Sequence, residues 1–112
     1  MRTRDNLVGD VVTFELSGKI MASDELDSFR GRVQYYLDLH KRAFVLDLQR
    51  VEWMNSAGLG ALVETYTSVL SRGGRFALAN ITNVQNLLNI TQLVKVFDTY
   101  DSRLEATRAV AS

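Results

Sequence analysis

Residues 43–74 constrain the fold more than any other part of the chain. Residues 43–48 form an almost unbroken apolar run, which predicts a strand covered by helices on both faces. Residues 49–54 lead into the hexamer Asn-Ser-Ala-Gly-Leu-Gly at 55–60, and the pair Gly73-Gly74 provides a strong helix stop. Between them, apolar residues recur at helical spacing, namely Leu59, Leu62, Val63, Tyr66 and Leu70. The chain therefore passes from a buried strand through a tight turn into a helix over about 56–71, and a serine stands at the turn.

The N-terminal part predicts two short strands and a helix. Residues 11–16 alternate between apolar and polar, which is typical of a half-buried strand near a sheet edge. Gly18 ends or kinks this strand, and Lys19-Ile20 adds a short second one. Ser23 caps a helix with acidic residues in its first turn. Its apolar face is formed by Leu26, Phe29, Val33, Leu37 and His40.

The C-terminal part continues the strand–helix alternation. Residues 75–81 predict a strand, and Thr82 or Asn83 caps a third helix. Val96-Phe97 is a candidate last strand, and the capping box of residues 102–105 opens a final helix. Repeated strand–helix units imply a parallel or mixed sheet with right-handed crossovers, so the fold class is α/β.

Composition limits the classes of function. A chain of 112 residues with 46% hydrophobic content predicts one domain over 1–112 with a normal core. Thirteen basic and thirteen acidic residues cancel, which argues against nucleic acid or a membrane as a partner. The absence of cysteine and the single histidine exclude thiol chemistry and a multi-histidine metal site. No signal peptide and no membrane-spanning stretch is present, so we expect a cytoplasmic protein.

The serine turn has the most localised chemistry in the sequence. Asn55 is a favoured N-cap residue that could accept from the N–H of residue 57 or 58, which makes Ser56 the first helical residue. A phosphate on the Ser56 hydroxyl would lie at the positive end of the helix dipole. Gly58 and Gly60 each lower the stability of a helix by about 1 kcal/mol relative to alanine. This loss would be offset if a partner's backbone or a neighbouring strand packs closely against the bare helix surface. Alternatively, the hexamer is only a capped helix start with small residues for packing.

Two other side chains admit two interpretations each, and a third, His40, bears on catalysis. Trp53 either flanks a partner surface or packs under the turn. Asp47 either orients the serine turn or is a hydrogen-bonded carboxylate at a strand end. His40 belongs to another helix end, so Ser56 has no evident base and an enzyme is the weakest of the hypotheses.

Beyond these patterns, nearly the whole chain resembles the STAS domain, the family of anti-sigma factor antagonists and sulfate-transporter tails. The family hallmark reads Asp-Ser-Ser-Gly-Leu-Gly and corresponds here to residues 55–60, after Asp47-Leu48 and the lead-in 51–54. The Gly73-Gly74-Arg75 stop and the segment 87–97, with Leu87-Leu88 before Thr91 to Phe97, are also similar to the family. The resemblance implies a mixed β-sheet of four to five strands with about four helices.

The resemblance also implies a function. The first serine of the family hallmark is phosphorylated by a partner kinase, and that position is Ser56. The unphosphorylated protein binds an anti-sigma factor, which is also a serine kinase of the ATP-binding histidine-kinase-like class, and so frees the sigma factor. A PP2C-like phosphatase and a homodimer fit the same scheme, with no cofactor, no metal and no catalytic residue of its own. The expected partner-binding residues are Trp53, Asn55, Ser56, Ala57, Gly58, Leu59 and Gly60.

Two positions depart from the hallmark and leave alternatives open. Asn55 replaces the usual Asp, so the cap is kept and a charge is lost, and Ala57 replaces the second Ser. The first alternative is therefore a non-switching STAS scaffold or transport-complex component. The alternative from another class is a small nucleotide- or phosphate-binding domain that uses Gly58 and Gly60, although a dinucleotide fingerprint and a Walker loop are both absent.

Overall fold

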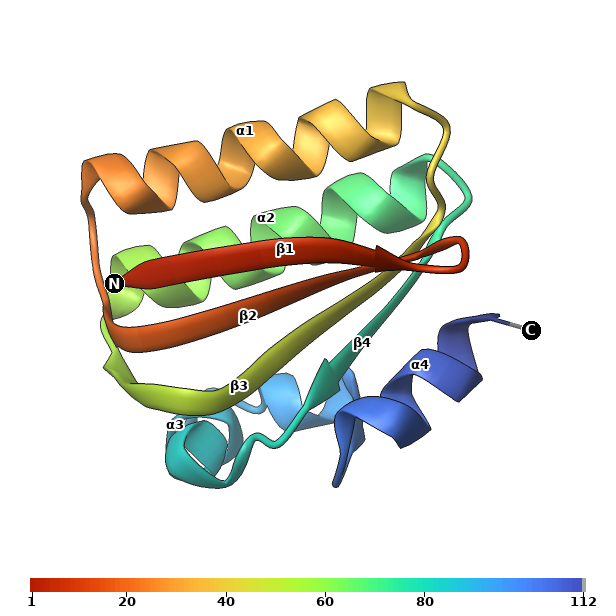
Figure 1. Cartoon of the computed structure of the whole chain (residues 1–112). Coiled ribbons are helices and arrows are strands. Elements are labelled where there is room, and N and C mark those ends of the chain that lie inside the picture. The colour runs from red at the N-terminus through yellow and green to blue at the C-terminus, as the bar shows by residue number, and fades with distance from the viewer. Residues whose placement is uncertain (112) are drawn as a thin grey trace.

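The computed structural model describes residues 1–111 and contains a mixed sheet with helices on both faces (Figure 1). Within this range, five strands lie side by side in chain order: β1 (Arg2–Val8), β2 (Val11–Ile20), β3 (Ala43–Met54), β4 (Arg75–Ala79) and β5 (Asp98–Tyr100). The helices are α1 (Asp24–Asp38), α2 (Ser56–Ser71), α3 (Gln85–Ile90) and α4 (Arg103–Ala111). β1 runs antiparallel to β2, and the other neighbours are parallel, as the strand–helix alternation predicts.

The core is divided by the sheet into a large and a small half. Figure 1 shows α1 and α2 side by side on one face and α4 on the other. Phe44, Leu46 and Leu48 of β3 join the large cluster under α1 and α2, whereas Val45 joins the small cluster under α4. Because both faces of β3 are covered, the strand shows no polar alternation over residues 43–48, and the prediction of a doubly covered strand is confirmed.

The N-terminal part differs from the sequence-based prediction in two ways. Residues 2–8, which the sequence pattern left unassigned, form the edge strand β1. β2 continues through Gly18 to Ile20 instead of breaking into two strands, and Gly18 accommodates the irregular pairing with a φ of 82°. The second strand predicted at Lys19-Ile20 is therefore the end of β2. β1 is hard to detect because its residues are only half buried or exposed.

Helix ends are predicted well where a side chain caps them. Ser23 Oγ accepts from the Leu26 N–H at 3.2 Å, and Ser102 Oγ accepts from the Glu105 N–H at 3.1 Å, so both predicted caps are confirmed. α1, however, ends at Asp38, and His40 follows in a left-handed conformation with its side chain exposed. The placement of His40 on the apolar face of that helix is therefore wrong.

The segment between β4 and β5 was predicted least accurately. It begins with a 3₁₀ turn (Thr82–Val84) before α3, and neither Thr82 nor Asn83 caps the helix. The Asn83 amide instead donates to the carbonyl oxygens of Gln49 and Val51 of β3, at 3.3 and 3.0 Å. The last strand is β5 and not Val96-Phe97, because Phe97 turns into the core against the ring of Tyr66, with centroids 5.2 Å apart.

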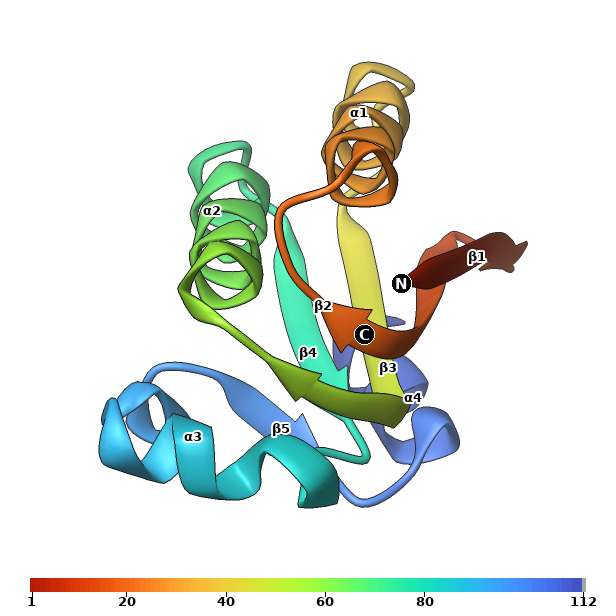
Figure 2. The same cartoon turned by 90° about the vertical axis from the view of Figure 1, so that its left-hand side faces the viewer.

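The carboxyl ends of β2 and β3 and the starts of α1 and α2 meet at one end of the molecule, which faces the viewer in Figure 2. In a parallel sheet with helical crossovers this is the end at which sites form. Among the described residues, no helix is long and apolar enough to cross a membrane.

Candidate partner-binding site

The serine turn connects the end of β3 to the start of α2. β3 ends at Met54, and the Asn55 N–H donates to the carbonyl oxygen of Ile20, the last residue of β2, at 3.1 Å. This bond extends the sheet ladder by one residue and fixes the direction in which the chain leaves the sheet. The predicted helix over 56–71 is confirmed to the residue as α2.

Asn55 is the N-cap of α2. Its backbone is extended, and its Oδ1 accepts from the N–H groups of Ala57 at 3.0 Å and Gly58 at 3.2 Å. One side-chain oxygen thus satisfies two of the donors that a helix leaves unpaired at its start. Both bonds expected from the sequence are present, so the cap is confirmed.

Ser56 is the first residue of α2, and its side chain is exposed. Within residues 1–111 its hydroxyl and its backbone N–H make no hydrogen bond. α2 carries no acidic residue in its first turn, so no carboxylate charge from that turn offsets the positive end of its dipole. The hydroxyl is therefore accessible, unpaired and placed where a negative charge would be stabilised.

The two glycines of the turn have different roles. A Cβ on Gly58 would lie 2.6 Å from the Ile20 carbonyl oxygen and 3.0 Å from the Met54 Cβ, whereas one on Gly60 would meet nothing within 4 Å. Gly58 is buried and Gly60 is exposed. The close approach at Gly58 is thus to a neighbouring strand, and its assignment to a bare partner-binding surface is wrong. Gly58 also cannot cradle a phosphate, because its N–H already binds Asn55.

The remaining predicted partner-binding residues, Trp53, Ala57 and Leu59, differ in exposure. Ala57 and Leu59 are half buried and pack against the large core cluster. Trp53 is 42% exposed, so it does not pack fully under the turn. Because Met54 points toward Gly58, alternation along β3 directs Trp53 to the other face of the strand. Trp53 therefore borders the serine turn rather than lying beside the Ser56 hydroxyl.

Val63 extends the exposed face of the turn and was missed as a surface residue. The helical pattern placed it in the core, but its exposed fraction is 36%, whereas Leu62 is buried. Ser56, Gly60 and Val63 are spaced i, i+4 and i+7, so they lie on one face of α2. The 3.6-residue period offered a signal, since adjacent apolar residues cannot both face the core fully. We call these three residues the α2 stripe.

Asp47 belongs to a polar network on the α4 side of the sheet and does not touch the serine turn. Its carboxylate accepts from Asn80 Nδ2 at 2.9 Å, from the Gln49 N–H at 3.0 Å and from Arg103 Nε at 2.9 Å. Arg103 also donates to Glu15 at 2.7 Å. Burial by itself would raise the pKa of Asp47, but these hydrogen bonds and the Arg103 charge outweigh it and hold that pKa below its ordinary value. The interpretation of Asp47 as a hydrogen-bonded carboxylate is confirmed.

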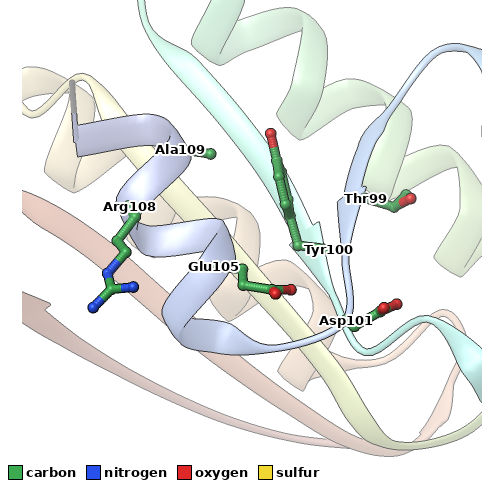
Figure 3. Close-up of a pocket in the computed structure, with 6 residues that line it drawn as sticks. All are labelled: Thr99, Tyr100, Asp101, Glu105, Arg108 and Ala109. Atoms are coloured by element: carbon green, nitrogen blue, oxygen red, sulfur yellow. The ribbon is translucent and has the colours of Figure 1, made fainter.

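The single histidine, His40, and the larger cavities all lie away from Ser56. His40 shares a cavity with Gly73, at the opposite end of α2, about 24 Å away along the helix axis. Another cavity, of about 640 Å³, lies between β5 and α4 (Figure 3). Its lining side chains do not converge on one point, and Arg108 points away from Tyr100. Among residues 1–111, no group of three His, Asp or Glu side chains is arranged to hold a metal ion.

Known proteins are similar to this chain over most of its length. The model of the family described as STAS domain matches residues 3–106. An anti-sigma F factor antagonist of Paenibacillus polymyxa is 29% identical over 100 residues, which cover 86% of this chain and 83% of the relative. The Thermotoga maritima protein TM1081 is similar with a TM-score of 0.84 and 28% identity, over 98% of this chain and 95% of that one.

A third similar structure is the Bacillus cell fate determinant SpoIIAA in its phosphorylated form. Its TM-score is 0.77 at 16% identity, with 96% of this chain and 98% of that chain covered, so this likeness concerns the fold. The expected α/β fold, with a mixed sheet of four to five strands and about four helices, is confirmed.

Proposed function

Because this chain belongs to the STAS domain family, we propose that it is an anti-sigma factor antagonist, a protein-binding module that is switched by phosphorylation of Ser56. The relative from Paenibacillus polymyxa that bears this name aligns with most of the chain and supports the proposal. In this proposal residues 1–112 form one STAS domain that acts in the cytoplasm by binding and not by catalysis.

One observation carries the proposal: Ser56 presents a free hydroxyl at the first position of a helix whose cap is complete without it. Phosphorylation would therefore not remove a structural hydrogen bond. The added charge of about −1.5 to −2 would lie at the positive end of α2, which stabilises anions by roughly 0.3–1 kcal/mol. The fold would persist while the charge of the exposed surface changes.

The proposed partner is an anti-sigma factor that is also a serine kinase of the ATP-binding histidine-kinase-like class. The Ser56 oxygen would attack the γ-phosphorus of ATP held by that kinase, with ADP leaving. The hydroxyl proton would go to a base on the kinase, since the neutral amide of Asn55 cannot accept it at neutral pH. A PP2C-like phosphatase would reverse the modification, and a homodimer is compatible with the scheme.

The α2 stripe supplies the contact surface in this proposal. Gly60 leaves the helix backbone bare one turn beyond Ser56, and Val63 offers an exposed apolar side chain one turn further. A phosphate on Ser56 would place a double negative charge at the edge of this surface. Because a buried, unpaired charge costs several kcal/mol, the partner would be released.

Asn55 favours a second candidate, a STAS scaffold without a switch. The cap geometry is complete with Asn, yet the residue lacks the carboxylate that could orient or deprotonate the hydroxyl. In this case Ser56 would remain unmodified, and the same surface would bind its partner constitutively.

The test is to incubate the chain with a co-purifying ATP-binding kinase and ATP, and to locate phosphate by mass spectrometry. We expect one phosphate on Ser56 and none in Ser56→Ala. Ser71→Ala, at the far end of the same helix, is the matched control and should be labelled normally. Calorimetry should then show that phosphorylated protein binds the unloaded kinase at least about tenfold more weakly. Phosphate found only on residues other than Ser56 would refute the phosphorylation switch. Tight binding to the kinase without any phosphorylation would establish the second candidate, a STAS scaffold without a switch.

A further inference from the structure

A cavity of about 260 Å³ lies on the sheet face opposite α1 and α2, beside the edge strand. Its lining residues are Arg4, Asp5 and Asn6 of β1, Thr13 and Glu15 of β2, and Arg103 of α4. In the β1–β2 register, Arg4 pairs with Glu15 and Asn6 pairs with Thr13. Phe14 points into the large core, so Thr13 and Glu15 point to the α4 side. α4 packs mainly on β3 and β4 and makes fewer contacts with β2.

Thr13 makes this cavity unusual. Its side chain is only 1% exposed, and within the described residues its Oγ1 has no hydrogen-bond partner. A buried polar atom without a partner costs about 1–3 kcal/mol, so such atoms are rare and point to a bound water, ion or ligand group. Thr13 is one of the residues that line the cavity.

The other free groups around the cavity are hydrogen-bond donors. Within residues 1–111, the side chains of Arg4 and Asn6 make no hydrogen bond or ion pair. Arg103 engages Asp47 and Glu15 through Nε and Nη2, which leaves Nη1 unpaired in this part of the chain.

The two carboxylates of the lining are already neutralised. Glu15 accepts from Arg103 at 2.7 Å and lies 4.0 Å from Arg50. Asp5 is held by Arg32, at 2.8 Å, and by the Tyr36 hydroxyl, both of which belong to α1 on the other face. The groups that remain free are the Arg4 guanidinium, Nη1 of Arg103, the Asn6 amide and the Thr13 hydroxyl. Guanidinium groups bind carboxylates and phosphates through charge-assisted hydrogen bonds.

We propose that this cavity binds a small oxyanion, a phosphate or carboxylate group, between Arg4 and Arg103, with the Thr13 hydroxyl and the Asn6 amide as further donors. The site lies on the opposite face of the sheet from the α2 stripe. It is therefore a ligand site separate from the proposed partner surface, and it does not depend on whether Ser56 is phosphorylated.

The test is a titration of ¹⁵N-labelled protein with inorganic phosphate and, in a second series, with acetate, at constant ionic strength. We expect saturable amide shifts at residues 4–6 and 13–15 with at least one of the two anions, and the tighter one identifies the class of ligand. Arg4→Gln should weaken binding about tenfold, and Thr13→Val about threefold. Arg2→Gln removes the same charge from the same strand outside the cavity, and it should leave the affinity unchanged.

Thermal unfolding separates a bound anion from a bound water. Thr13→Val removes the buried hydroxyl, so it should raise the melting temperature in chloride, and this gain should shrink when the anion is present. Failure of both anions to saturate would overturn the proposal. So would an equal loss of affinity in Arg2→Gln and Arg4→Gln, because the anion would then be attracted only by the general charge of β1.

Discussion

A Cβ atom on Gly58 would lie 2.6 Å from the carbonyl oxygen of Ile20, so only glycine lets α2 begin this close to the end of β2. The same two segments are joined by the bond from the Asn55 N–H to that carbonyl oxygen. The glycine and the cap together fix where Ser56 emerges. The hallmark hexamer thus combines a packing requirement and an exposed hydroxyl within three residues.

The first prediction separates the two glycines. Gly58→Ala should lower the free energy of unfolding by about 1–3 kcal/mol, because the added methyl group forces a shift against β2 backbone. Gly60→Ala should raise it by about 0.5–1 kcal/mol, because that site is open and alanine favours a helix. Urea denaturation of the two variants measures both values. Equal effects would mean that the backbone around Gly58 relaxes freely.

The second prediction concerns the cap. Asn and Asp cap helices about equally well, so Asn55→Asp should change the free energy of unfolding by less than about 0.5 kcal/mol. Its carboxylate would lie beside Ser56 and should speed phosphorylation by about tenfold, below the ~10²–10⁴ of a fully positioned base because this site is exposed. Asn55→Ala is the control and should lose about 1 kcal/mol of stability. Equal rates in Asn55→Asp and wild type would show that the residue is only a cap.

The third prediction tests the α2 stripe. Val63→Lys should weaken partner binding by at least about tenfold with little change in stability, because it places a charge on an exposed apolar contact. Leu70→Lys is a matched control on the same helix, with 41% exposure but about 21 Å from Ser56 along the axis, and it should bind normally. Calorimetric titration with the kinase measures both affinities. If only Leu70→Lys binds the kinase more weakly, the interface lies at the other end of α2.

The fourth prediction follows from the depressed pKa of Asp47. A carboxyl group whose pKa is lower in the folded state stabilises the fold fully above its unfolded value of about 3.9, and this contribution is lost as the pH falls toward the folded value. Arg103→Met removes one cause of the depression while keeping the aliphatic stem. It should therefore cost about 1.5–3 kcal/mol at pH 7, and less as the pH is lowered from 5 to 3. Urea denaturation at each pH measures the difference in free energy of unfolding between wild type and Arg103→Met. A difference that does not change with pH would contradict the assignment of Arg103 as a cause of the low pKa of Asp47.

The sequence was most informative where one local signal decides the structure. Residues 55–71 contain an N-cap, an apolar period and a glycine stop that agree, and α2 has the predicted bounds. The same holds for the caps at Ser23 and Ser102. Long-range pairing left no such signal. Residues 2–8 form a strand because β2 lies beside them, and the Asn83 amide binds β3 because the carbonyl oxygens of Gln49 and Val51 lie within hydrogen-bond distance.

By itself the sequence determined the α/β class, the alternation of strands and helices after residue 23 and the place of the serine turn. These features depend on periodicity, caps and glycines, which act between near neighbours. The tertiary structure alone decided which glycine faces a strand and which faces solvent, since Ile20 lies 38 positions before Gly58. It also decided that Val63 is exposed and that Thr13 faces a cavity among donors from β1 and α4. Burial and charge pairing arise between segments far apart in the chain, so only the folded molecule fixes them.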